Sequence, residues 1–388
     1  MKEFDYFQPT KIKFGKGRLD ELGEIAKEFG DKCLLVTTAD EVLQPLFDRV
    51  KKILSDAGME VAHFDGVQPN PTVADNTKGA ELAKKTDPDV VIGVGGGSSM
   101  DSAKAIAVEA THEGTTWDYL HFRDTQPTDA TLPIISVPTT SGTGSQVTQV
   151  AVVTNTKERN KSAIFNAKIF PNVGLIDPEL MLTLPVHITA STGFDVFCHA
   201  FESTLNPGSS PYVNHLAKKA IETVVTTLPG LLKNPKDIDA REKMAFADLF
   251  AGYCIANSGV TLPHGVGMAI SGMYPNVMHG ESLAVIYPAF TRFTWEHAIT
   301  EFAMLGRILE PKLEEASDKE AAQKSCQLMD DFLKKIDMYK SLEEFDMPEE
   351  EIPELAEASM RLPDYEQNPR VATEKEMLEL IKQAYSNK

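Results

Sequence analysis

The chain has 388 residues, which is too long for one small hydrophobic core and favours two domains. Its composition, with 42% hydrophobic and 24% charged residues, is typical of a soluble globular protein. A formal net charge of −19 argues against nucleic acid or an anionic membrane as a partner, because both require a basic surface.

The sequence shows no targeting feature. The first residues, MKEFDYFQPT, lack the apolar core of a signal peptide, and no run approaches the length of a membrane span. The cysteines, Cys33, Cys198, Cys254 and Cys326, are scattered and form no C-x-x-C pair, so neither a disulfide framework nor a zinc ribbon is indicated. These features predict reduced thiols and a cytoplasmic protein.

The first half of the chain alternates short apolar runs with helical patterns. Strands are predicted at 33–38, 61–64, 90–94 and 133–137, and helices at 41–57, 71–85 and around 100–107. This alternation predicts right-handed crossovers and a parallel sheet. The strands are nearly continuous apolar runs, as is typical of strands covered by helices on both faces.

The second half has a different pattern. Strand signals stop after Leu175-Ile176-Asp177-Pro178, and from Pro185 onward long helical patterns dominate. The predicted fold is therefore an α/β domain with a Rossmann-like parallel sheet, residues 1–181, followed by an all-helical domain, residues 182–388. We find no internal repeat or low-complexity linker in the sequence, so we expect close packing with a ligand cleft between the domains.

A glycine-rich stretch, GVGGGSSMDSAK at residues 93–104, ends the third predicted strand. Glycines at a strand–helix junction let backbone N–H groups approach an anion, and the helix N-terminus adds partial positive charge. The stretch matches neither G-x-G-x-x-G nor a P-loop, because Lys104 comes too late. A pyrophosphate site is the favoured interpretation, and a tight turn needed only for packing is the alternative.

A second loop of small residues, PTTSGTGS at 138–145, leaves the fourth predicted strand in the same direction. Ligands of parallel sheets gather outside the carboxyl ends of the strands. The alternative is an ordinary Ser/Thr-rich loop that hydrogen-bonds its own backbone. The two loops together favour a dinucleotide.

The stretch TGFDVFCHAFES, residues 192–203, has apolar residues all round a helical wheel, as a buried helix does. Asp195, His199 and Glu202 nevertheless form one polar stripe at i, i+4 and i+7. Burying a carboxylate and an imidazole without partners costs several kcal/mol. A bound metal would offset that cost.

Asp195 and His199 on adjacent helical turns can share a metal, as i, i+4 histidines do in known zinc sites. Two histidine–glycine pairs follow in the helical half, and their histidines, His264 and His279, would supply two further ligands. One carboxylate with three imidazoles suits Fe²⁺ or Zn²⁺ better than Mg²⁺ or Ca²⁺. The alternative is that each histidine is structural.

Several of these motifs together resemble a known family. GGGSSMDSAK, VPTTSGTGSQVT, the TGFDVFCHA helix and the two His-Gly pairs are similar, in this order, to signatures of the iron-containing alcohol dehydrogenases. The likeness runs from residue 14 past His279. It implies a dehydroquinate synthase-like fold, in which a nucleotide-binding α/β domain is followed by a helical metal-binding domain. The implied cofactors are NAD or NADP and Fe²⁺, with Zn²⁺ as the alternative metal. A homodimer or larger homo-oligomer is also implied.

The resemblance also implies the roles of individual residues. It assigns metal ligation to Asp195, His199, His264 and His279. For the dinucleotide it points to Asn70, Gly97, Ser98, Asp101, Thr139, Thr140, Thr143, Val152 and Lys161, to which we add Gly96 of the glycine turn and Thr148 of the second loop.

The sequence departs from the family pattern at two informative positions. Many members carry a histidine four residues after the third ligand, but Met268 stands here, so no proton relay is carried over. NAD-preferring members often have aspartate at the end of the first strand, where the match is Thr38, with Asp40 close by. Thr38 is counted as a dinucleotide contact, and both NAD and NADP stay open.

The sequence thus predicts a metal-dependent, NAD(P)-linked alcohol dehydrogenase or aldehyde reductase for a small alcohol or aldehyde, with no catalytic residue assigned beyond the metal centre. A glycerol-type polyol dehydrogenase of the same fold is one alternative. A nucleotide-binding protein without catalysis is the other.

Overall fold

The computed structural model describes residues 3–387; Met1, Lys2 and Lys388 lie outside the described residues. The described chain divides into two compact units. One, the sheet unit, comprises residues 7–184 and 236–245. The other, the helical unit, comprises residues 3–6, 185–235 and 246–387.

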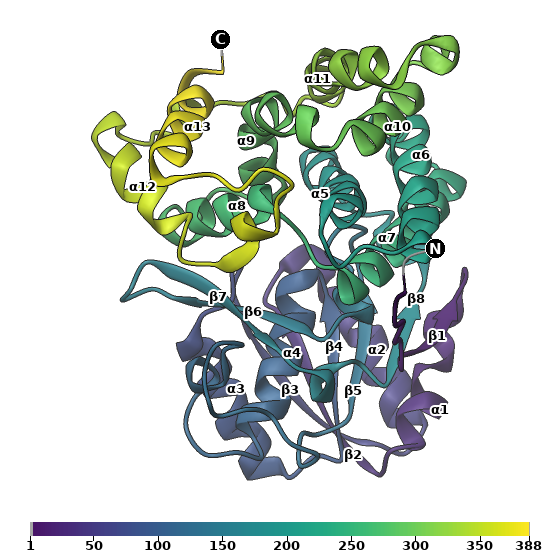
Figure 1. Ribbon diagram of the computed structural model, residues 1–388. Coiled ribbons are helices and arrows are strands. Elements are labelled where there is room, and N and C mark those ends of the chain that lie inside the picture. The colour runs from purple at the N-terminus through teal and green to yellow at the C-terminus, as the bar shows by residue number, and fades with distance from the viewer. Residues whose placement is uncertain (1–2, 388) are drawn as a thin grey trace. The chain divides into compact units, whose positions relative to one another are not determined.

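The sheet unit is built on parallel strands (Figure 1). Within the described residues its main sheet has six strands in the order β1-β8-β5-β4-β2-β3, and each hydrogen-bonded pair is parallel. The strands are β1 Lys11–Phe14, β2 Lys32–Thr38, β3 Glu60–Val67, β4 Val90–Gly95, β5 Ile134–Pro138 and β8 Val173–Ile176. The helices of this unit are α1 Leu22–Lys27, α2 Gln44–Asp56, α3 Val73–Thr86 and α4 Gly97–Glu109.

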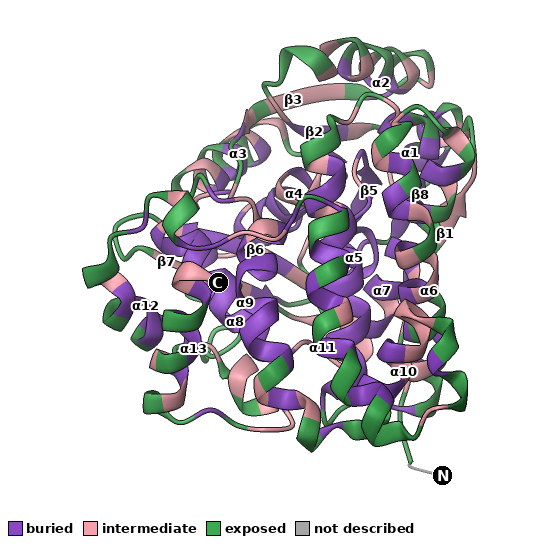
Figure 2. Ribbon diagram, turned by 90° about the horizontal axis from the view of Figure 1, so that it is seen from above, coloured by how far each residue is buried: buried purple, intermediate pink, exposed green. Residues whose placement is uncertain are grey.

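Alternate residues of the strands enter two separate hydrophobic clusters. On β2, Leu35 belongs to the cluster that contains Phe47 and Val50 of α2, whereas Leu34 belongs to the cluster that contains Ile106 of α4. Because the side chains of a strand point alternately to the two faces of the sheet, helices cover both faces. Helix α2 accordingly alternates between buried and exposed residues (Figure 2).

The order of the strands creates a switch point. From β2 the chain adds β3 on one side, and from β4 it adds β5 on the other, so β2 and β4 are neighbours at the position where the direction of winding reverses. Ligands of doubly wound sheets bind outside the carboxyl ends of such strands. Thr38 ends β2 here, and the glycine turn follows β4.

The four predicted strands and the predicted helices of the first half are present, and the predicted fold class is confirmed. The edge strand β1 and the antiparallel hairpin of β6 Val150–Asn155 and β7 Asn160–Phe165 were not predicted. Strand β1 reads KIKF, whose two lysines suit a sheet edge and hide the apolar signal. Because β1 precedes the predicted strands, the glycine turn follows the fourth strand of the chain rather than the third.

The helical unit is formed by helices and loops, and no strand occurs among residues 185–387 of the described chain. Its helices are α5 Val186–Leu205, α6 Pro211–Lys233, α7 Ile238–Asn257, α8 Leu262–Met273, α9 His279–Thr294, α10 Ile299–Leu309, α11 Asp318–Lys335, α12 Ile352–Ala358 and α13 Glu374–Ser386. Residues 236–245, which include the first turns of α7, belong to the sheet unit. Helix α5 is buried from Gly193 to its end, as its apolar wheel predicts.

Two further findings concern the apolarity of the helices and the state of the cysteines. Within residues 3–387, none of the helices is both long enough and apolar enough to span a bilayer. The four cysteines are buried free thiols.

Candidate metal centre and dinucleotide site

The glycine turn opens directly into α4. Gly96 caps this helix, and within the described residues the cap makes no side-chain hydrogen bond. Gly96, Gly97 and Ser98 are partly exposed, whereas the rest of α4 is buried. An accessible helix N-terminus with open N–H groups is suited to a phosphate.

The second loop lies against this turn. A Cβ atom added at Gly97 would stand 2.6 Å from Cγ2 of Thr143, so a side chain at this position would separate the loops. One added at Gly96 would stand 3.4 Å from Cγ2 of Thr140. The hydroxyl of Thr140 is buried and has no hydrogen-bond partner among the described residues. The structure therefore brings together the two loops that the sequence suggested separately.

Asp101 and Lys104 of α4 fasten the second loop from beneath. Oδ1 of Asp101 accepts a 2.6 Å hydrogen bond from the hydroxyl of Ser145, and Oδ2 accepts one of 3.1 Å from the backbone N–H of Val152. The Lys104 ammonium donates to the Ser145 hydroxyl at 2.9 Å and to the carbonyls of Thr148 and Val150 at 2.9 and 2.7 Å. These contacts give Asp101 a structural task, and its direct contact with a dinucleotide stays a prediction.

Three of the other predicted dinucleotide residues, Asn70, Lys161 and Thr38, lie outside the two loops, and Thr139 belongs to the second loop. The Lys161 ammonium donates a 2.8 Å hydrogen bond to Oδ1 of Asn70, so these two residues, far apart in sequence, are neighbours. Thr38 donates through its hydroxyl to Oδ2 of Asp40 at 3.2 Å. Thr139 is buried, and its N–H bonds to the carbonyl of Gly95 at 2.9 Å.

The burial of Lys104 beneath the second loop can be tested by the pH dependence of the free energy of unfolding. Burial lowers the pKa of Lys104 from 10.5 to about 8, although Asp101 acts to raise it. At pH values between these two pKa values, Lys104 is protonated in the unfolded chain and largely deprotonated in the folded chain. The free energy of unfolding therefore increases as pH rises.

We expect urea unfolding to show the stability of the wild type relative to Lys104→Met rising by about 2 kcal/mol between pH 7 and pH 10. Comparison with the variant cancels the titration of other groups. An unchanged difference at the two pH values would contradict a lysine whose charge is disfavoured by burial.

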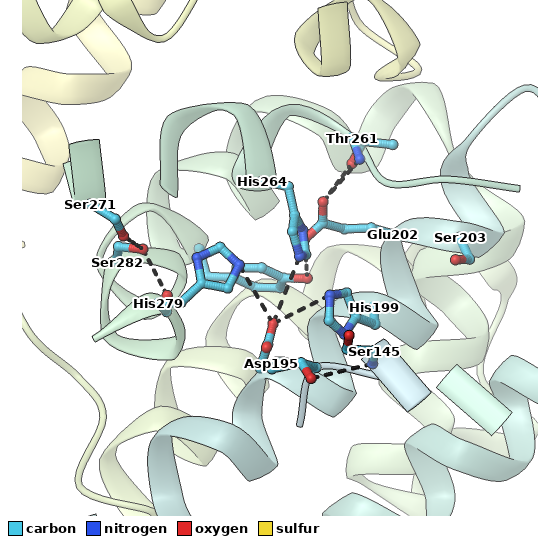
Figure 3. Close-up of polar contacts among 12 residues, drawn as sticks. Ser145, Asp195, His199, Glu202, Ser203, Thr261, His264, Ser271, His279 and Ser282 are labelled. Carbon is cyan, nitrogen blue, oxygen red and sulfur yellow. Dashed lines mark hydrogen bonds and ion pairs between the residues drawn. The ribbon is translucent and has the colours of Figure 1, made fainter. Parts of the chain in front are cut away.

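The four predicted metal ligands lie together in the helical unit (Figure 3). Asp195 and His199 come from α5, His264 from the first turn of α8 and His279 from the start of α9. The Nε2 atoms of His199, His264 and His279 lie 3.5, 3.7 and 3.9 Å from Oδ1 of Asp195. The donor atoms of Asp195, His199 and His264 are all within 4.8 Å of one another.

The donor atoms fit a single cation. Oδ1 of Asp195 and Nε2 of His264 are buried and have no hydrogen-bond partner among the described residues. Ligand atoms about 2.1 Å from a tetrahedral metal are about 3.4 Å apart, and the distances of 3.5–3.9 Å around Oδ1 are slightly longer. The group whose donor atoms all lie within 4.8 Å of one another does not include His279, so its ring would have to move inward to share the metal.

The charges within the cluster are strongly coupled. Burial acts to raise the pKa of Asp195, but His199, His279 and His264 together lower it to about 2. Burial likewise acts to lower the pKa of His264, but Glu202 and Asp195 raise it to about 10. A carboxylate that stays ionised among imidazoles is a suitable metal ligand, and a cation would replace the proton of His264.

The glycine of the second His-Gly pair explains how α9 reaches the cluster. A Cβ atom added at Gly280 would collide with the backbone carbonyl of Ser191 on α5. Only glycine therefore allows the first turn of α9 to approach α5 so closely, and this approach places His279 near Asp195. The first pair is less restrictive, because a Cβ at Gly265 would meet Asp364 at 3.4 Å.

We expect Gly280→Ala to displace the start of α9, because backbone cannot yield as a flexible side chain does. The free energy of unfolding should fall by at least about 1–3 kcal/mol, and bound metal should decrease with it. Gly230→Ala on α6 is the matched control, since a Cβ there meets nothing within 4 Å and should be neutral or stabilising. Equal stability of the two variants would contradict the assigned contact.

Sequence reasoning missed three supporting residues. Lys104 was considered only as a P-loop lysine, and Ser145 was not assigned a role. Glu202 was noted as part of the polar stripe but received no function. The signal for Glu202 was present, because a third charged group on a buried helix requires partners.

Comparison with known proteins identifies the family of this chain. The family model of the iron-containing alcohol dehydrogenases matches residues 9–178, and the model of that family's C-terminal part matches residues 189–385. The chain is 32% identical to the NAD-dependent methanol dehydrogenase of Bacillus methanolicus, with 98% of this chain and 99% of that protein aligned. It is also 32% identical to the 1,3-propanediol dehydrogenase of Citrobacter freundii, with the same coverage.

A solved structure is similar along the whole length. The archaeal halo-thermophilic alcohol dehydrogenase from a Red Sea brine pool has a TM-score of 0.93 at 34% identity, covering 98% of this chain and 99% of that one. These matches identify an NAD(P)-linked oxidoreductase of the alcohol dehydrogenase class. Within this class, the chain belongs to the iron-containing alcohol dehydrogenase family. They confirm the predicted function and do not support the two alternatives.

Proposed function

We propose that this chain uses Fe²⁺ and NAD to interconvert small primary alcohols and their aldehydes. The observation that carries the proposal is Oδ1 of Asp195, a buried oxygen without a hydrogen-bond partner among the described residues, with three imidazole nitrogens turned toward it. The relatives act on methanol and 1,3-propanediol according to their names, which supports a small alcohol as substrate.

Each group has a defined part in the proposed reaction. A metal bound by Asp195, His199, His264 and His279 supplies a Lewis acid for the substrate oxygen. The N-terminus of α4 binds the pyrophosphate, and the loop from Thr139 to Thr148, fastened by Lys104, orients the nicotinamide end for hydride transfer. Asp195 contributes the negative charge of the ligand set, while the imidazoles bind as neutral donors.

No protein side chain is proposed to move the proton of the hydroxyl. Met268 lies one turn after His264 on α8, where relatives with a further histidine would have a titratable group, and it is buried. A thioether does not exchange protons at any physiological pH. The proton would therefore have to pass to solvent or to a cofactor hydroxyl, because no side chain of this chain is assigned to take it.

Fe²⁺ is proposed over Zn²⁺ because the chain belongs to the iron-type family. The donor chemistry of one carboxylate and three imidazoles accepts both metals. Zn²⁺ is the alternative, and metal analysis of protein purified without oxygen distinguishes the two.

NAD is proposed over NADP because of Asp40. This carboxylate accepts the hydroxyl hydrogen of Thr38 at 3.2 Å, so it is held at the carboxyl end of β2, next to the switch point. A carboxylate there binds ribose hydroxyls and repels a 2′-phosphate. Asp40 would thus replace the aspartate that NAD-preferring relatives carry at the position of Thr38.

We also propose that the protein is a cytoplasmic homodimer or larger homo-oligomer. Four buried free thiols support a reducing compartment, where such cysteines stay reduced. The homo-oligomer rests on the family resemblance and is checked by light scattering of the purified chain.

His264→Ala should lose bound metal while retaining NAD, because its Nε2 is the proposed metal ligand and the residue lies in the helical unit. We expect metal affinity to fall by more than about 100-fold, since losing a residue that merely holds a ligand already costs 10–100-fold. Metal content and NAD titration measure the two effects. His215→Ala, which removes an exposed histidine of α6, is the control; full metal content in His264→Ala would refute the ligand assignment.

Asp40→Asn should shift the cofactor preference toward NADPH. The expected rise in the ratio of kcat/KM for NADPH to that for NADH is on the order of tenfold, which corresponds to about 1.4 kcal/mol of removed repulsion. Glu41→Gln removes an exposed charge one residue away and should leave the ratio unchanged. A ratio that does not respond to Asp40→Asn would overturn the placement of this carboxylate.

A further inference from the structure

Glu202 is a buried carboxylate that the proposed reaction does not use. It lies on α5, two turns after Asp195, and its relative exposure is 0%. An ionised carboxyl group at such a position is costly unless charged or hydrogen-bonding partners compensate it. The partners of Glu202 therefore show what it does.

The two oxygens of Glu202 face different groups (Figure 3). Oε2 accepts hydrogen bonds from the backbone N–H and the hydroxyl of Thr261, at 3.0 and 3.3 Å. Oε1 accepts one from the hydroxyl of Tyr287 at 3.3 Å and lies 2.9 Å from Nδ1 of His264. The contact with Nδ1 is an ion pair whose alignment falls outside that of a hydrogen bond.

We propose that Glu202 is a positioning residue for the metal centre: its carboxylate holds the hydrogen of His264 on Nδ1, so that Nε2 presents its lone pair toward Asp195 and the metal. The inference rests on the proposed function, because it assumes that Nε2 is a ligand. A histidine that binds metal through one nitrogen commonly gives the other N–H to a carboxylate, which fixes the ring and increases its basicity.

A purely structural role would require only an acceptor for Thr261 and for the hydroxyl of Tyr287, and other residues already fasten the segment of Thr261. The Ser203 hydroxyl donates to the carbonyl of Gly259 at 3.0 Å, and the Ser258 hydroxyl donates to the carbonyl of Ser203 at 2.8 Å. The amide of Asn206 donates to the carbonyl of Val260 at 2.8 Å. The negative charge of Glu202 is thus needed by His264 and not by the backbone.

Glu202→Gln separates the two roles. The amide oxygen can still accept from Thr261, which leaves the amide NH₂ group beside Nδ1 of His264. An NH₂ group donates, so it favours the tautomer with hydrogen on Nε2, and this tautomer cannot bind metal through Nε2. The fold should survive because shape and the Thr261 contact are preserved.

The test is titration of the metal-free protein with Co²⁺, which reports both affinity and, through its visible spectrum, coordination geometry. We expect Glu202→Gln to bind Co²⁺ 10–100-fold more weakly than the wild type, with a changed spectrum and unchanged NAD affinity. Ser203→Ala, which loses a contact to the same segment but touches no ligand, should bind as the wild type does. Affinity within twofold of wild type in Glu202→Gln would overturn the inference.

A second measurement covers a variant that fails to fold. Nitrogen-15 NMR of histidine-labelled wild type, with His264→Ala for assignment, reports which ring nitrogen carries the hydrogen in the metal-free protein at a pH where the ring is neutral. Hydrogen on Nδ1 supports the inference, and hydrogen on Nε2 overturns it. If the wild type and Ser203→Ala bind no Co²⁺ at all, the proposed metal site itself fails, and the role of Glu202 fails with it.

Discussion

The helical unit depends on the burial of one carboxylate in a helix that has no wet face. Asp195 lies on α5 with apolar residues on every side, and its charge requires compensation that water cannot provide. Three imidazoles from α5, α8 and α9 provide it, so the same electrostatic demand that makes Asp195 costly draws three helices together. Glu202 is a second buried carboxylate, and it lies next to His264 rather than at the centre of the cluster. Its charge is paired with His264, and it accepts a hydrogen bond from the segment that leads into α8.

In the sheet unit, two loops of small residues must be held next to each other. Glycine and threonine let backbone N–H groups approach an anion, but they contribute little packing of their own. Lys104 compensates for this, because one buried ammonium donates to Ser145, Thr148 and Val150 at once. The buried side of the loops is therefore held by hydrogen bonds from Lys104, whereas Gly96, Gly97 and Ser98 on the other side are partly exposed.

Local patterns predicted most of the fold and suggested both candidate sites, whereas the roles of single residues came from the family resemblance and stay predictions. The apolar runs of β2, β4 and β5 and the apolar wheel of α5 extend over most of each element, so periodicity identified them. Strand β1, with two lysines in KIKF, and the β6–β7 hairpin lack such a signal, and their pairing depends on residues far away in sequence. The same holds for Lys104, Asn70 with Lys161, and Glu202 with His264, because no spacing along the chain reveals a contact between distant segments. The collision at Gly280 likewise appears only once α5 and α9 are packed.

The central claim is that one cation is held by Asp195 and three histidines. The most direct measurement is metal analysis of protein purified without oxygen, combined with X-ray absorption at the edge of the metal found. We predict one iron per chain, surrounded by nitrogen and oxygen donors at about 2.0–2.2 Å with a clear imidazole signature. A chain that oxidises alcohols at full rate with no bound metal, or a metal coordinated mainly by sulfur, would contradict this account.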